Sequence, residues 1–187
     1  MLRLTPAALV LALAQPAAAD EFTDTLESAL EAYRSGDVSA AREDLDFAGK
    51  LLAAMKSEAL AKFLPAAPGG WTRGEASDEE AAAGGMMGMF GGGTSAAATY
   101  TKGAEQVTVT LVADSPMVSG LGAMISGMAG LAGGKPLRIQ RTEFTEQDGD
   151  LQGVVNGRVM VSVTGGASVE DKRAFLEAMD FGALGNF

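Results

Sequence analysis

The stretch Leu151–Val163, LQGVVNGRVMVSV, decides the fold class of the second half of this chain. Two valine-rich runs, residues 151–155 and 158–163, flank Asn156-Gly157. This dipeptide readily adopts the positive φ angles of a tight hairpin turn, so it is a strong local signal for two paired strands. We therefore predict an antiparallel hairpin here and build the rest of the sheet outward from it.

The segments before this hairpin supply the other predicted strands. Val107, Val109 and Leu111 alternate with Thr108, Thr110 and Val112, a pattern typical of a strand. Residues 97–101 are expected to pair with that strand through a turn at residues 102–104. One further strand is expected over residues 137–146, before a turn at Asp148-Gly149.

Two helices are expected to accompany these strands. Residues 118–132 are small and apolar and are predicted to form a buried helix. Ser168 is predicted to begin the last helix, because Asp171 follows three residues later and completes a capping box. The expected inner face of that helix consists of Ala174, Phe175, Ala178 and Met179.

The chain before residue 65 has helical periodicity. Two runs are separated by Gly36, which suits a left-handed helix end, and by Asp37, which can cap the next helix. They predict an antiparallel helical hairpin that leaves apolar surface for another contact. The predicted seams are Phe22, Leu26, Ala29, Leu30 and Tyr33 in the first helix, and Ala41, Leu45, Ala48, Leu52, Met55, Ala59 and Phe63 in the second.

Together these patterns predict an α+β fold: an N-terminal antiparallel helical hairpin followed by an antiparallel β-sheet with helices packed on it. The hairpin is expected over residues 20–64 and the α+β domain over residues 97–187. Residues 65–96 are predicted to be a linker with a mobile Gly/Met-rich loop, GGMMGMFGGG, at 84–93. Trp71, the only tryptophan, is interpreted as a core anchor at this boundary.

Residues 1–19 have the pattern of a cleavable secretory signal. Arg3 provides the positive charge, residues 7–14 a short apolar run, and Ala17-Ala18-Ala19 the small side chains that a signal peptidase reads. The apolar run is too short to cross a hydrocarbon core of ~30 Å. We expect cleavage after Ala19 and a periplasmic mature protein without a lipid anchor, since the chain has no cysteine.

Charge and composition exclude several function classes. Without residues 1–19 the chain keeps 13 basic and 24 acidic residues, a net charge of −11, which repels nucleic acid and anionic lipid. We expect no nucleic-acid partner and no stable membrane anchor. The absence of histidine and cysteine removes Ser-His-Asp and Cys-His nucleophiles and the usual zinc and haem ligands. No cofactor is expected, and a non-catalytic role is favoured.

Methionine is the residue type whose use is unusual: the chain has ten, and Met86, Met87 and Met89 cluster beside Phe90. Three interpretations stay open. The loop can be an apolar surface that contacts a protein or lipid partner. Its thioethers can hold Cu(I), since soft sulfur ligands suit that ion. Met87 and Phe90 can also pack against the sheet.

Glu146, Asp148 and Asp150 are spaced closely enough in sequence to attract calcium. They lack the start and the distal glutamate of an EF-hand loop, so a polar hairpin turn explains them.

The leading hypothesis is a soluble, exported, non-catalytic binding protein whose partner is another envelope protein. The alternatives are a copper-handling protein that uses Met86, Met87 and Met89, and a carboxylate-dependent envelope hydrolase with two acidic residues facing each other in a cleft. The oligomeric state is left open by the sequence.

Several turn motifs are spread along the mature chain: Phe63-Leu64-Pro65, Pro68, Gly70-Trp71, Thr99-Tyr100, Ala113-Asp114-Ser115-Pro116 and Asn156-Gly157-Arg158. In these motifs the chain resembles a group of small exported proteobacterial proteins of unassigned function, over most of the mature length, and this resemblance implies no activity. Gly70-Trp71 leading into a sheet also resembles the PsbP/Mog1-like α/β sandwich.

Overall fold

The computed structural model describes residues 20–74, 93–116, 118 and 134–187. The chain divides into two compact units, one that ends at Leu52 and one that runs from Ala53 to Phe187. The predicted signal, nearly all of the Gly/Met-rich loop and nearly all of the predicted helix at 118–132 lie outside the described residues. The described part has the α+β class expected from the sequence, with two N-terminal helices followed by an antiparallel sheet and further helices.

The first unit is built from α1 (Asp20–Ser35) and the beginning of α2 (Val38–Ala61). Gly36 between them has a φ of 86°, the left-handed conformation that ends a helix at little cost for glycine. The Asp37 carboxylate accepts a hydrogen bond of 3.0 Å from the Ala40 N–H, and so caps α2. Both features of this connection were predicted.

The contact between α1 and α2 differs from the predicted seam. Ala29, Ala41 and Ala48 are buried at the observed contact. The same stripe contains residues that are partly buried: Phe22, Thr25, Ala32, Asp44 and Leu51. From here on, the seam means this observed stripe. Spacings of three and four residues keep this stripe on one side of each helix, and its small members let two helices approach closely. Most of the larger members of the predicted seam were placed wrongly, because they are exposed: Leu26, Leu30, Tyr33, Leu45, Leu52 and Met55.

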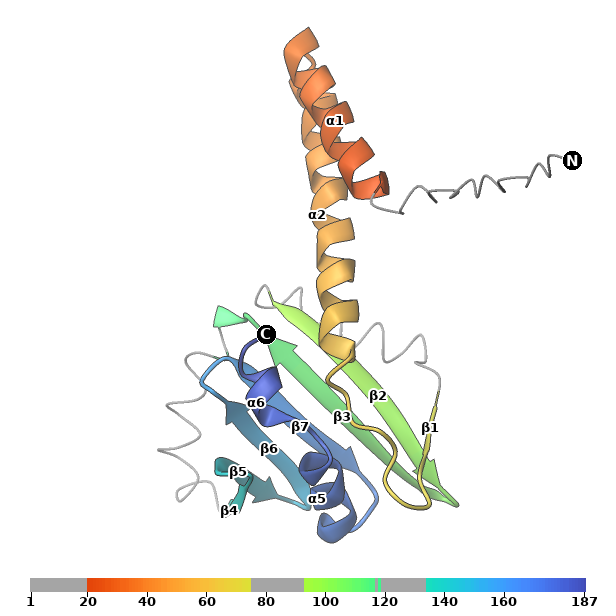
Figure 1. Cartoon of the computed structure of the whole chain (residues 1–187), viewed down its shortest axis with the longest axis vertical. Helices are drawn as coiled ribbons and strands as arrows, with labels where there is room; N and C mark the ends of the chain where they lie inside the picture. The colour runs from red at the N-terminus through yellow and green to blue at the C-terminus, as the bar shows by residue number, and fades with distance from the viewer. Residues whose placement is uncertain (1–19, 75–92, 117, 119–133) are drawn as a thin grey trace, which may run out of the picture. The chain divides into compact units, whose positions relative to one another are not determined.

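The second unit contains one seven-stranded antiparallel sheet in the order β1-β2-β3-β7-β6-β5-β4 (Figure 1). The sheet is two meanders joined at its middle, where β3 pairs with β7. The strands are β1 (Thr72–Arg73), β2 (Thr94–Lys102), β3 (Glu105–Ala113), β4 (Lys135–Ile139), β5 (Thr142–Gln147), β6 (Asp150–Val155) and β7 (Val159–Gly165).

Three predicted hairpins are present. β2 pairs with β3, β5 with β6, and β6 with β7, each in the expected antiparallel sense. Asn156 and Gly157 have φ angles of 50° and 69°, and Asp148 and Gly149 have 52° and 84°. These positive φ angles are those that the Asn-Gly and Asp-Gly dipeptides were expected to supply.

The single strand predicted over residues 137–146 is wrong, because β4 and β5 form a further hairpin there. Its turn places Gln140 and Arg141 at φ angles of 48° and 70°, a conformation that sequence patterns assign to glycine or asparagine. The Gln140 Nε2 lies 2.8 to 3.1 Å from the carbonyl oxygens of Leu176, Glu177 and Met179. A long-range contact with the end of the next helix therefore holds this turn.

Two helices, α5 (Val169–Glu177) and α6 (Phe181–Leu184), lie on the same face of the sheet (Figure 1). The predicted cap is confirmed, since the Ser168 hydroxyl accepts a hydrogen bond of 3.1 Å from the Asp171 N–H. The predicted inner face is correct for Phe175 and Met179 but wrong for Ala178, which is exposed, and it omitted Leu176 and Lys172. The short α6 was not predicted.

An aromatic cluster lies between the sheet and α5. The Phe175 ring centroid is 5.3 Å from that of Trp71 and 4.7 Å from that of Tyr100, and all three side chains are buried. The Tyr100 hydroxyl donates a hydrogen bond of 2.6 Å to the Pro65 carbonyl, and burial raises the pKa of this hydroxyl. Trp71 is therefore a core anchor, as predicted.

Among the described residues of this unit, Lys172 is the charged one that is buried, with only 2% of its side-chain surface exposed. Its Nζ donates hydrogen bonds of 2.7 Å to the Gly149 carbonyl and to Asp150 Oδ1. Asp150 Oδ1 also accepts from the Gly165 N–H at 3.3 Å. A buried ammonium needs such partners, and here they tie α5 to the turn between β5 and β6 and to the end of β7.

Candidate functional site

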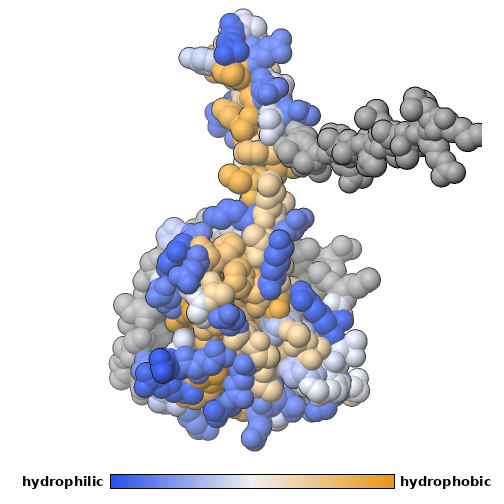
Figure 2. Space-filling model, viewed as in Figure 1, coloured by the Kyte–Doolittle hydropathy of each residue, from blue (hydrophilic) through white to orange (hydrophobic). Residues whose placement is uncertain are grey.

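Large apolar side chains lie exposed on the hairpin of α1 and α2. Seven such residues occur within the 27 positions from Leu26 to Leu52, and their exposed fractions range from 38% to 67%. Figure 2 shows apolar residues gathered along this hairpin beside charged ones. We call the following six residues the hairpin face: Leu26, Leu30, Tyr33, Val38, Leu45 and Leu52.

Helix geometry places these residues on one side of the hairpin. Leu26, Leu30 and Tyr33 each come directly after a residue of the α1 seam, and Leu45 and Leu52 each come directly after a residue of the α2 seam. One residue corresponds to a rotation of about 100° about the helix axis. Because the helices run antiparallel, positions that follow the seam lie on the same side of the hairpin in both helices.

The opposite side of the hairpin has a different character. Glu21, Asp24, Thr25, Ser28, Asp44 and Phe47 line one shallow depression there. Most of these residues come directly before a seam position, which places them across the seam from the hairpin face. The opposite side is therefore polar and acidic apart from Phe47, which is 44% exposed, whereas the hairpin face is apolar apart from Arg42, which directly follows the seam residue Ala41.

The apolar residues of the hairpin face form two rows, one on α1 and one on α2, which we call ridges. Between them lie the small seam alanines, such as Ala29 and Ala48, which are buried in the contact between the helices. Gly49 interrupts the α2 ridge between Leu45 and Leu52, and a Cβ atom at Gly49 would meet no heavy atom within 4 Å. The α2 ridge thus has a gap at Gly49, which we call the notch, and no neighbouring residue requires a glycine there.

The hairpin is also the most acidic part of the described chain. Residues 20–52 contain nine acidic and three basic residues, a net charge of −6 within a chain whose total is −10. Glu27, Glu31, Arg34 and Asp46 directly follow residues of the hairpin face, so they form its outer rim. Asp46 lies 3.9 Å from Arg42 in a highly exposed ion pair, which contributes little to stability.

The residues singled out from the sequence are only partly in view. Met86, Met87, Met89 and Phe90 lie outside the described residues. The copper hypothesis on these methionines and the contact role of that loop therefore stay predictions, and titration with Cu(I) against a competing chelator tests the first. The sequence did predict leftover apolar surface on the hairpin, but it assigned most of the hairpin-face residues to the seam.

Glu146, Asp148 and Asp150 do not share one cation site. Glu146 lies 3.5 Å from the Lys135 ammonium and accepts from the Gly149 N–H, whereas Asp150 is bound to Lys172. Within residues 20–74, 93–116, 118 and 134–187, no group of three or more acidic side chains is arranged to hold a metal ion. The polar-turn interpretation agrees with these contacts.

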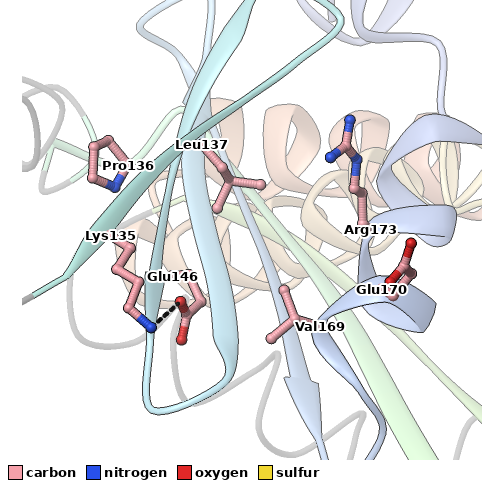
Figure 3. A pocket seen from close by; sticks show the side chains of 7 residues that line it. All are labelled: Lys135, Pro136, Leu137, Glu146, Val169, Glu170 and Arg173. Atoms are coloured by element: carbon pink, nitrogen blue, oxygen red, sulfur yellow. Dashed lines mark ion pairs between the residues drawn. The ribbon is translucent and has the colours of Figure 1, made fainter.

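A crevice between the β4–β5 hairpin and α5 is shown in Figure 3. Its volume is about 270 Å³. Lys135 pairs with Glu146 across its lining, and Arg173 pairs at 2.7 Å with Glu177, which does not line it. Binding pockets for small molecules are usually larger, so we assign no ligand to this crevice. Its lining is Lys135, Pro136, Leu137, Glu146, Val169, Glu170 and Arg173.

Asp114 is the most heavily paired carboxylate described. Its oxygens lie 2.9 Å from Arg158 Nη2 and 3.0 Å from Lys56 Nζ. Hydrogen bonds from Arg158 and then from Lys56 hold the pKa of Asp114 below its ordinary value of 3.8. A carboxylate that is so engaged joins α2 to the β6–β7 turn and is poorly suited to act as a general acid.

Replacing Asp114 with asparagine is expected to cost about 1 kcal/mol at pH 7, because two partly exposed ion pairs are lost. Asparagine tolerates the φ of 55° at this position, so the change isolates the charge. The folded-state pKa lies below the unfolded value of 3.8, so the stabilisation is complete well above pH 3.8 and is lost as the pH falls below it. Urea unfolding of both proteins from pH 7 to pH 2.5 measures this, and a gap in stability that does not shrink with acid contradicts it.

The fold and the exposed face define an α+β protein whose N-terminal unit is a helical hairpin with one apolar side. None of the helices in the described ranges combines the length and apolar character required to cross a bilayer. Comparison with protein-family models, with curated proteins and with solved structures finds no match for this chain.

Proposed function

We propose that this chain is an exported, non-catalytic binding protein that contacts another protein of the cell envelope through the hairpin face. The observation that carries the proposal is six large apolar side chains exposed on one side of two helices. Burying a leucine-sized side chain contributes about 1.5–3 kcal/mol, and contiguous exposed apolar surface is typical of contact sites. The signal pattern at residues 1–19 supports export, and the lack of histidine and cysteine supports a role without catalysis.

Site-specific photo-crosslinking in the periplasm tests this proposal. A crosslinker at Leu30 lies on the hairpin face, and one at Ser28 lies on the opposite side of the same helix. We expect discrete crosslinked species from position 30 and much weaker ones from position 28. Equal yields at both positions, or none at either, would refute the proposal.

The double variant Leu30→Gln/Leu45→Gln tests whether the apolar side chains of the hairpin face are needed for the contact. Both side chains are about half exposed, so unfolding should change by less than about 1 kcal/mol. We expect crosslinking from Tyr33 to fall at least fivefold in this variant while its thermal unfolding curve is retained. A lower melting temperature together with lost crosslinking would point to a folding defect, and the single variants would then separate the two effects.

A further inference from the structure

Resting on the proposed function, we infer that the partner places on the hairpin face an amphipathic α-helix whose polar side carries lysine or arginine. The inference names the shape and the charge of the occupant. Each of these follows from a separate feature of the hairpin.

The shape follows from the two ridges of the face. A helix with an apolar stripe along one side can pack between apolar ridges that two neighbouring helices contribute. The notch at Gly49 fits this arrangement. Glycine within a helix is less favourable than alanine, and the open space around Gly49 shows no packing need for it. A large side chain of the docked helix can enter there.

The charge follows from the rim and from the hairpin as a whole. Three of the four rim residues are acidic, namely Glu27, Glu31 and Asp46. Two basic residues accompany them: Arg34 in the rim, and Arg42, which directly follows the seam residue Ala41 and pairs with Asp46. The hairpin carries −6 in all. Opposite charges around an apolar contact accelerate and orient binding, whereas like charges oppose it. A basic helix therefore complements this face.

The same charges disfavour two other occupants. A second copy of this chain would bring another hairpin of charge −6 against the first. An anionic bilayer surface would be repelled for the same reason. At physiological salt this repulsion acts over about 8 Å, so it opposes a close contact with either occupant.

Two designed 21-residue peptides serve as probes, with the same leucine stripe and either lysine or glutamate at every polar position. A scrambled lysine peptide of identical composition controls for general attraction to an acidic protein. We expect the patterned lysine peptide to bind the purified protein at least tenfold more tightly than either of the others, by fluorescence anisotropy. Leu30→Gln/Leu45→Gln should abolish this binding, and Gly49→Leu should weaken it.

Matched charge variants locate the attraction. Glu27→Gln/Glu31→Gln removes two charges from the rim, and Glu21→Gln/Asp24→Asn removes two from the opposite side of the same helix. Both variants have the same net charge. We expect the rim variant to lose at least three times more affinity for the lysine peptide than the control variant.

The other outcomes overturn the inference in distinguishable ways. Equal binding of the lysine and glutamate peptides, still blocked by Leu30→Gln/Leu45→Gln, removes the charge preference but keeps a helix-binding face. Binding of the scrambled peptide at full strength means general electrostatic attraction. A dimer in sedimentation that Leu30→Gln/Leu45→Gln dissolves identifies a second copy as the occupant. No peptide binding while the Leu30 crosslinks persist leaves the proposed function standing with a different kind of partner surface.

Discussion

Replacing Gly165 with alanine is expected to lower the free energy of unfolding by about 3–5 kcal/mol, a loss in the range of the most damaging single substitutions. Gly165 ends β7, opposite Val107, and its φ is 125°, a conformation almost restricted to glycine. An added Cβ would overlap the carbonyl oxygen of Gln106, which already accepts a hydrogen bond of 3.1 Å from the Gly166 N–H. The backbone would have to move at the central strand pair of the sheet.

Urea denaturation followed by circular dichroism measures this effect. The control is Gly166→Ala at the next position, where a Cβ atom meets nothing within 4 Å and φ is not in the positive range. We expect that control to unfold within about 0.5 kcal/mol of the wild type. If Gly165→Ala behaved like Gly166→Ala, the described pairing of β3 with β7 would be wrong at its end.

The second large effect is expected for Phe175→Ala, at about 3–5 kcal/mol. Phe175 has no exposed surface and lies at the centre of the aromatic cluster with Trp71 and Tyr100. Truncation removes both ring contacts and leaves a cavity, because the sheet and α5 cannot collapse fully into the space. The loss adds to the reduced burial of the ring.

Thermal unfolding and the fluorescence of Trp71 read out this variant together. We expect a lower melting temperature and a red shift in emission, because the single tryptophan of the chain loses its neighbour and becomes more hydrated. Val169→Ala serves as the control on the same helix, since Val169 is 38% exposed, and should cost less than about 1 kcal/mol. A Phe175→Ala protein with unchanged emission would place Trp71 away from this ring.

Local chemistry made much of the sheet predictable. The turns at Asn156-Gly157 and Asp148-Gly149 are predictable because these residue types readily adopt the positive φ angles that the turns require. The start of α5 is predictable because the Ser168 hydroxyl caps the helix locally. The turn at Gln140-Arg141 depends instead on the carbonyls of Leu176 and Glu177 in α5 and of Met179 just beyond it, 36 to 39 positions away. No local pattern predicts such a turn. Tertiary contacts here override residue preference.

The hairpin face illustrates a second limit of periodicity. Spacing identifies a stripe of apolar residues on a helix, but not whether the contact falls on its large or its small members. In α1 the contact centres on Ala29, and Leu30 beside it is exposed. Lys172 was missed for the converse reason, since lysine is rarely buried unless several partners converge on it, as Gly149 and Asp150 do.

The pairing of β3 with β7 also governs the order in which this protein can be completed during synthesis. β3 ends at Ala113, whereas β7, the strand with which it pairs at the middle of the sheet, begins only at Val159. A ribosome that adds about 5–20 residues per second needs roughly 2–9 s to supply the stretch between them. Until then the β2–β3 hairpin has an open edge with unpaired backbone groups, which a chaperone can cover and which another nascent chain can join. The middle of the sheet is thus the last part to close.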